Sequence, residues 1–149
     1  MNLPLGIAIR NFFGVFVLTP FEEDLLKRLR EALGPEDREA VTVQIRTFTT
    51  VRRLLKHLDE PNAHGFTNFY TTRLGKDVSD SRHTKRLTSR PADSVLGTAR
   101  VLFEGGEIEV TFLAVDGVLF AMDYRSPQRI YYPPGDYRIA ALKLAVETK

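Results

Sequence analysis

The sequence predicts an α+β fold in which an N-terminal segment of two helices packs on a C-terminal antiparallel β-meander of four to five strands. Two observations lead to this prediction: a capping signal with leucines at helical spacing near residue 19, and two glycine-containing hairpin turns in the last third. The length of 149 residues is typical of a single domain. We expect its helical part at about 19–59, its sheet part at about 66–146 and a long polar loop at about 75–93.

The first helix has both a start and a stop signal. Thr19, Pro20 and Glu22 form a capping box, in which the threonine hydroxyl and the glutamate carboxylate each accept a hydrogen bond from the other residue's backbone N–H. Gly34 followed by Pro35 ends the helical pattern. Between these signals the apolar residues recur at helical spacing, at Leu25, Leu26, Leu29 and Leu33.

Residues 36–59 fit two periodicities. Val41, Val43 and Ile45 alternate as in a strand. A longer series steps by three or four residues, as in a helix: Val41, Ile45, Phe48, Val51, Leu55 and Leu58. The longer series favours a second helix, with room for a break in the β-branched cluster from Thr47 to Val51. After Pro61, the aromatic and β-branched residues 66–72 favour a strand.

Two hairpins define the predicted sheet. Gly105-Gly106 and Asp116-Gly117 are two-residue turn signals, because these residues accept the positive φ of a type I′ turn. Taken literally, the turns set the pairing register: Phe103 opposes Ile108, Val101 opposes Val110, Val115 opposes Val118, Thr111 opposes Met122, and Glu109 opposes Tyr124.

This register makes both faces of the meander apolar, whereas a sheet covered on one side alternates apolar and polar residues. One face carries Ala99, Val101, Phe103, Ile108, Val110, Phe112, Leu119 and Ala121. The opposite face carries Leu96, Leu102, Leu113, Val115, Val118, Phe120, Met122 and Tyr124. The two helices can cover one face. We expect the other to be covered by residues 3–18, by the C-terminal tail, by a ligand or by a second subunit.

The C-terminal tail also fits two structures. Leu142, Leu144 and Val146 alternate as in a strand, while Ile139, Leu142 and Val146 fit a helix. We favour strands on both sides of the turn at 133–136, over 129–132 and 137–146. The alternative is a C-terminal helix that begins after an N-cap at Asp136.

Composition and motifs exclude several classes of function. The chain has no Cys, which excludes disulfides, cysteine-ligated zinc and cysteine catalysis. No stretch approaches the ~20 apolar residues of a membrane span, so we expect a cytoplasmic protein without a membrane partner. Nucleotide-binding, hydrolase and metalloprotease motifs are absent, and the sequence favours a non-enzymatic role. The histidines His57, His64 and His83 lack the spacing of metal ligands, so we expect no metal and no other cofactor.

Three hypotheses name candidate residues. The leading one is self-association or protein binding through an apolar sheet face and a tyrosine-rich rim, because tyrosine is enriched at interfaces; its residues are Phe120, Met122, Tyr124, Tyr131, Tyr132 and Tyr137. A second is a small-molecule or enzymatic pocket with Asp123 and Arg100. For Asp123 we expect a structural ion pair, with Arg125 or Arg129.

The third hypothesis is nucleic-acid binding by a basic loop. The whole chain has a formal net charge of only +2, yet residues 73–90 hold six basic residues against two acidic ones. Phe69 and Tyr70, just upstream, could stack on bases. Its candidate residues are Arg73, Lys76, Arg82, Lys85, Arg86 and Arg90. Because no nucleic-acid-binding motif accompanies them, this partner is the less favoured one.

Overall fold

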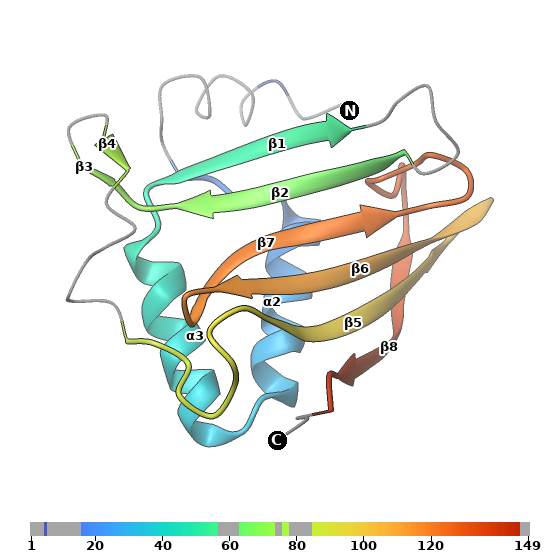
Figure 1. Ribbon diagram of the computed structural model, residues 1–149. Helices are drawn as coiled ribbons and strands as arrows, with labels where there is room; N and C mark the ends of the chain where they lie inside the picture. Colours follow the sequence, from blue (N-terminus) through green and yellow to red (C-terminus); the bar gives the residue numbers. More distant parts are fainter. Residues whose placement is uncertain (1–4, 6–15, 57–62, 74–75, 78–84, 147–149) are drawn as a thin grey trace.

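The computed structural model describes residues 5, 16–56, 63–73, 76–77 and 85–146 (Figure 1). Two helices, α2 (Pro20–Ala32) and α3 (Pro35–Thr47), come first. The strands that follow are β1 (Thr50–Lys56), β2 (His64–Tyr70), β3 (Thr72–Arg73), β4 (Lys76–Asp77), β5 (Ser94–Phe103), β6 (Gly106–Val115), β7 (Val118–Arg125) and β8 (Tyr137–Leu144).

The longer strands form one antiparallel six-stranded sheet in the order β1-β2-β7-β6-β5-β8, and β3 pairs with β4 in a separate two-stranded sheet. Both helices pack on one face of the large sheet (Figure 1). The predicted α+β class is therefore confirmed, whereas the expected four to five strands are too few.

Helix α2 begins as its sequence predicts. Oγ1 of Thr19 accepts a hydrogen bond from the N–H of Glu22 at 3.2 Å, and the Glu22 carboxylate accepts one from the N–H of Thr19 at 2.8 Å. The leucines at helical spacing are buried against the sheet. Gly34 lies between the two helices and is the N-cap of α3, and Pro35 is the first residue of α3.

The second helix is shorter than predicted. Helix α3 ends at Thr47, and residues 50–56, which were expected to be helical, form strand β1. Strand β1 pairs with β2 along its whole length, with Val51 opposite Phe69. The β-branched residues around Thr50 accept the extended backbone, and pairing with β2 supplies the hydrogen bonds that a helix would otherwise provide. Residues 57–59 of the predicted helix lie outside the described residues.

The first predicted hairpin turns one residue earlier than expected. Phe103 pairs with Gly106, and Val101 pairs with Ile108 rather than Val110. The turn therefore consists of Glu104 and Gly105, and Gly105 has the positive φ of +91° that favours glycine. The register is displaced by two residues, and such a displacement leaves every side chain on its predicted face.

The second hairpin turns where predicted, at Asp116 and Gly117, with Val115 opposite Val118. A β-bulge at Phe120 then shifts the register by one residue, so Leu113 pairs with Ala121. The predicted pairs of Thr111 with Met122 and of Glu109 with Tyr124 are therefore wrong. A shift of one residue exchanges the faces, so the bulge turns the side chains of Met122 and Tyr124 towards the helices.

The bulges reduce the apolar surface that was predicted for the second face. A further irregularity between Val95 and Gly97 accompanies the burial of Leu96 in the core. Leu96, Met122 and Tyr124 are fully buried in the core beneath the helices, whereas Asp123 lies on the opposite face with Thr111. The apolar residues that stay on the second face are Leu102, Leu113, Val115, Val118 and Phe120.

The C-terminal tail forms one of the two predicted strands. Residues 137–144 are strand β8, which pairs with β5. The predicted strand is therefore confirmed there, and the alternative C-terminal helix is wrong. Residues 129–132 form no strand, and Arg129 has a positive φ of +56° that interrupts an extended chain.

Gly97 allows β5 and β8 to approach each other closely. A Cβ at this position would lie 2.7 Å from the carbonyl oxygen of Lys143 and 3.3 Å from Cα of Leu144, and these backbone atoms are held by the sheet. We expect Gly97→Ala to lower the free energy of unfolding by about 1–3 kcal/mol, as overpacked sites do. Urea denaturation measures this change.

Gly135→Ala is the matched control, because no atom lies within 4 Å of the added Cβ. We expect this control to change the free energy of unfolding by no more than about 0.5 kcal/mol. Equal losses in the two variants would contradict the close approach of β5 and β8.

Candidate functional site

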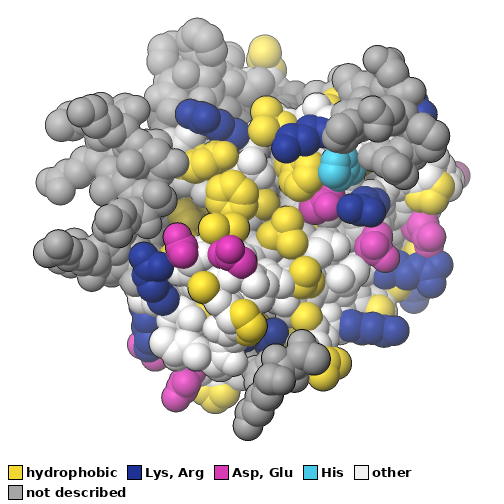
Figure 2. All heavy atoms as spheres, in the orientation of Figure 1, with side chains coloured by type: hydrophobic (Ala, Val, Ile, Leu, Met, Phe, Trp, Pro, Cys, Tyr) yellow, Lys and Arg dark blue, Asp and Glu magenta, His cyan; other side chains and the backbone are white. Residues whose placement is uncertain are grey.

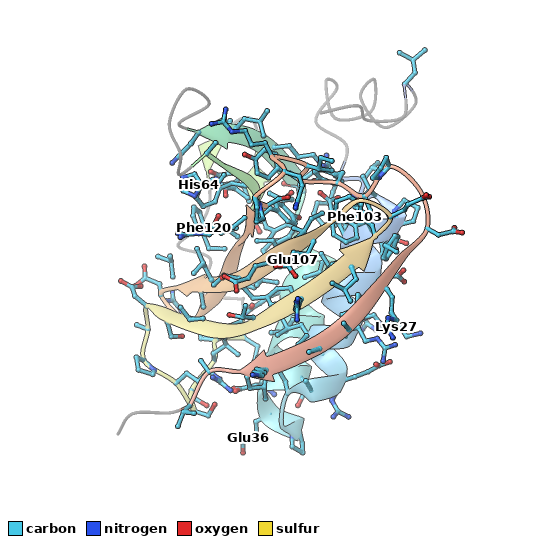
Figure 3. All side chains as sticks on the ribbon, turned by 90° about the vertical axis from the view of Figure 1, so that its right-hand side faces the viewer. Lys27, Glu36, His64, Phe103, Glu107 and Phe120 are labelled. Atoms are coloured by element: carbon cyan, nitrogen blue, oxygen red, sulfur yellow. The ribbon has the colours of Figure 1, made fainter. Side chains whose placement is uncertain are left out.

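The candidate site is the open face of the sheet, which we define as the face of the six-stranded sheet turned away from α2 and α3. Figure 3 views the molecule from the side, with His64 and Phe120 on this face and Lys27 of α2 on the other. Among the described helices and strands, none packs across it. Figure 2 looks directly onto this face.

An apolar patch lies on the part of the open face formed by β1, β2, β7 and β6. Figure 2 shows hydrophobic side chains gathered over the centre of this view. Leu54 is 41% exposed and Val115 is 43% exposed, while the ring of Phe120 meets that of Tyr70 edge-on at 5.8 Å. The apolar patch consists of Leu54, Phe66, Tyr70, Leu113, Val115, Val118 and Phe120.

Cations from the edge strand β1 lie over the rings of this patch. The guanidinium of Arg52 is 5.1 Å from the ring centroid of Tyr70, and Nζ of Lys56 is 4.9 Å from that of Phe66. Both distances permit a cation–π interaction. One side of the apolar patch is therefore positively charged.

A charged row crosses the open face beside the apolar patch. Strand pairing places Lys56, His64, Arg125, Glu109 and Arg100 next to one another on β1, β2, β7, β6 and β5 in turn. Arg100 is paired with Glu107 at 2.8 Å. Glu109 and Arg125 are both exposed, and within the described part of the chain Glu109 makes no ion pair.

Asp123 lies between the apolar patch and the charged row and is only 7% exposed. Its carboxylate oxygens lie 3.2 Å from Nδ1 of His64 and 3.6 Å from Nε of Arg125. The expected ion pair with Arg125 is thus present. Arg100 lies two strands away on β5, beyond β6, so the two residues of the pocket hypothesis do not come together.

The tyrosines do not form an exposed rim. Tyr124 is fully buried with Met122, and Tyr131 is buried as well. The half-buried Tyr132 and Tyr137 pack their rings edge-on against Phe21 of α2, at 5.7 and 5.1 Å. Of the residues predicted to bind a partner, Phe120 alone lies on the open face, because the bulge moved Met122 and Tyr124 to the helix side.

The tyrosines belong instead to a buried polar network around Glu22. Its carboxylate accepts hydrogen bonds from Nε of Arg53 at 2.8 Å, from the hydroxyl of Thr67 at 2.9 Å and from the hydroxyl of Tyr132. The hydroxyl of Tyr124 donates to Thr67 at 3.0 Å. Burial, followed by the negative charge of Glu22, raises the pKa of Tyr132 well above its ordinary value.

This network has a structural role, because Glu22 is wholly enclosed and its carboxylate is already saturated with donors. The sequence identified Glu22 only as a capping residue. Arg53 and Thr67 carried no local signal, since they meet Glu22 only when β1 and β2 pack beneath α2.

The basic loop does not present a row of free cations in its described part. Lys85 pairs with Glu39 at 2.7 Å, and Arg86 donates to the carbonyl of Asp116 at 2.6 Å. The side chain of Arg90 is 7% exposed and pairs with Asp37 at 3.1 Å. Arg73 and Lys76 fall on β3 and β4, and Arg82 lies outside the described residues.

A small recess of about 260 Å³ lies where β5 begins, lined in part by Arg90, Asp93 and Val95. It includes neither residue of the pocket hypothesis. Among the described residues, no three acidic or histidine side chains are placed to hold a metal ion. His57 and His83 lie outside those residues.

No helix in the described part of the chain is long and apolar enough to cross a membrane. Comparisons of the chain with protein-family models, with curated proteins and with solved structures each found no match.

Proposed function

We propose that this chain is a non-enzymatic interaction module that binds a protein surface, either a second copy or another protein, through the open face of its sheet. The observation that supports the proposal is the apolar patch, whose aromatic and aliphatic side chains are partly exposed, whereas α2 and α3 pack on the opposite face of the sheet. Contiguous apolar surface of this kind is typical of protein interaction sites.

The surroundings of the apolar patch support the same function. Protein interfaces combine an apolar centre with a polar and charged border that fixes the orientation of the partner. Here the cations of β1 border the apolar patch on one side, and the charged row borders it on another. The alternatives lack a comparable feature, since Lys85, Arg86 and Arg90 are each bound by an acidic side chain or a backbone carbonyl, and Asp123 and Arg100 lie apart.

Site-specific photo-crosslinking tests this proposal in the cell that produces the chain. A benzophenone amino acid placed at Val115, which is exposed on the open face, should form a covalent adduct with a protein. The matched control carries the same group at Lys27, which is exposed on α2 on the opposite side of the sheet (Figure 3). The mass of the adduct distinguishes a second copy of the chain from a different protein. Equal adduct yields at the two positions would contradict the proposed function.

A further inference from the structure

We infer that the occupant of the open face is a second copy of this chain, packed about a two-fold axis that runs along the sheet between β6 and β7. The inference rests on the proposed function and specifies its partner. Two sheets that pack face to face keep their strands aligned to within about 30°. In a two-fold dimer the same surface of each copy must complement itself.

The charged row is self-complementary about this axis. Glu109 on β6 and Arg125 on β7 are direct pairing partners and lie at the same height along the strands. A two-fold axis between the strands places β6 of one copy over β7 of the other. Glu109 then faces the partner's Arg125, and the symmetry repeats this contact.

The neighbouring rows match in the same way. Thr111 and Asp123 are pairing partners, so the hydroxyl of Thr111 faces the partner's Asp123 carboxylate. One row further, Leu113 is paired with Ala121, so these apolar residues face each other between copies. Val115 meets the partner's Val118 at the end of the strands. On the two central strands, charged residues thus face an opposite charge or a hydroxyl, while apolar residues face apolar ones.

Other positions of the axis lack this complementarity. An axis along β7 would place Arg125 against the partner's Arg125, and an axis along β6 would oppose the two Glu109 carboxylates. An axis between β2 and β7 would press Phe66 onto the partner's Asp123. Juxtaposed like charges weaken association, so among these axes parallel to the strands the one between β6 and β7 best matches the charges of Glu109 and Arg125.

The open face is also large enough. Its six strands, spaced about 4.8 Å apart and up to ten residues long at about 3.4 Å per residue, give the face an area of about 800 Å². A stable protein–protein interface buries about 800 Å² on each partner.

Charge reversal at the axis tests the inference on the purified chain. Sedimentation across micromolar concentrations should show a species with twice the monomer mass of 16.9 kDa. We expect Arg125→Glu and Glu109→Arg each to raise the dimer dissociation constant at least about tenfold, because each reversal acts at both symmetric contacts. The double variant exchanges the two charges and should recover most of the dimer.

Lys27→Glu is the control. It makes the same charge change as Arg125→Glu, but on the far side of the molecule, and should leave the dimer intact. Near-ultraviolet circular dichroism checks that each variant is folded. If a charge-reversal variant is not folded, the alanine variants Arg125→Ala and Glu109→Ala are measured in its place. A chain that stays monomeric, a single reversal without effect, or a double variant that fails to recover would each overturn the inference. If the chain is monomeric but crosslinks a different protein at Val115, the inference fails and the proposed function stands.

Discussion

Arg53→Met is expected to lower the free energy of unfolding by about 3–5 kcal/mol, the loss typical of a broken buried ion pair. The side chains of Arg53 and Glu22 are only 4% and 0% exposed. Removing the guanidinium leaves the Glu22 carboxylate enclosed without its cation, because solvent cannot reach it. Urea denaturation measures the loss, and a chain of this size should also melt about 10 °C lower.

The control for this variant is Arg28→Met. Arg28 pairs with Glu31 at 3.8 Å, but the two side chains are 60% and 52% exposed, so the pair is screened by water. We expect this variant to lose no more than about 0.5 kcal/mol.

A second comparison separates the unpaired charge from the lost packing. Adding Glu22→Gln to Arg53→Met removes the orphaned carboxylate, and we expect the double variant to regain part of the lost stability. A loss for Arg53→Met no larger than that for Arg28→Met would contradict the burial of the network.

Gln44→Leu should cost about 2 kcal/mol or more of folding stability, because each buried backbone group left without a partner costs about 1–3 kcal/mol. The amide of the buried Gln44 accepts a hydrogen bond from the N–H of Leu119 at 2.9 Å and donates to the carbonyls of Gly117 and Lys85 at 3.0 and 2.7 Å. Leucine has a similar size but makes none of these bonds. The variant therefore leaves the N–H of Leu119 and the carbonyl of Lys85 without a partner where α3 meets the β6–β7 hairpin, while the carbonyl of Gly117 keeps its bond from the N–H of Leu87 at 2.8 Å.

Hydrogen exchange provides a second measurement, since the amide of Leu119 should exchange faster in Gln44→Leu than in the parent chain. Thr42→Ala is the control on the same helix, because the hydroxyl of Thr42 bonds only the carbonyl of Arg38 at an exposed position. We expect Thr42→Ala to change stability by no more than about 0.5 kcal/mol. Unchanged exchange at Leu119 would show that Gln44 does not hold the hairpin end.

The elements that could be predicted have signals within a few residues of one another. The capping box at Thr19, the turn at Asp116-Gly117 and the stop at Gly34-Pro35 each depend on neighbouring backbone groups. Such groups lie close together in the chain, so their contacts form independently of the tertiary fold. The first helix and the second turn are therefore where the sequence placed them.

The elements that could not be predicted depend on distant partners. Val51 and Leu55 continue a helical series, and only pairing with β2 makes residues 50–56 a strand. The bulge at Phe120 follows Leu119, whose N–H is bound by Gln44 from 75 positions away in the sequence. No window of neighbouring residues contains that hydrogen bond.

The candidate site shows the same limit. The tyrosine-rich segments were assigned to an interface because tyrosine is enriched at interfaces. Tyr124 was also counted on the outer face, but one bulge exchanges the faces of every residue after it. Tyr124 and Tyr132 therefore complete a buried network, while Asp123 moves to the open face. The apolar character of that face was predicted, as were Leu113, Val115, Val118 and Phe120, but the patch residues of β1 and β2 were not.

Local chemistry along the chain thus established the α+β class, the start of α2, the position of the second hairpin turn and an apolar second face. These features follow from short-range hydrogen bonding and side-chain periodicity, and both can be recognised in the sequence itself. Tertiary packing decided the identity of β1, the bulge at Phe120 and the residues that make up the open face. A one-residue shift in strand register is set by contacts between distant residues, and it reverses which side chains face the core and which face a partner.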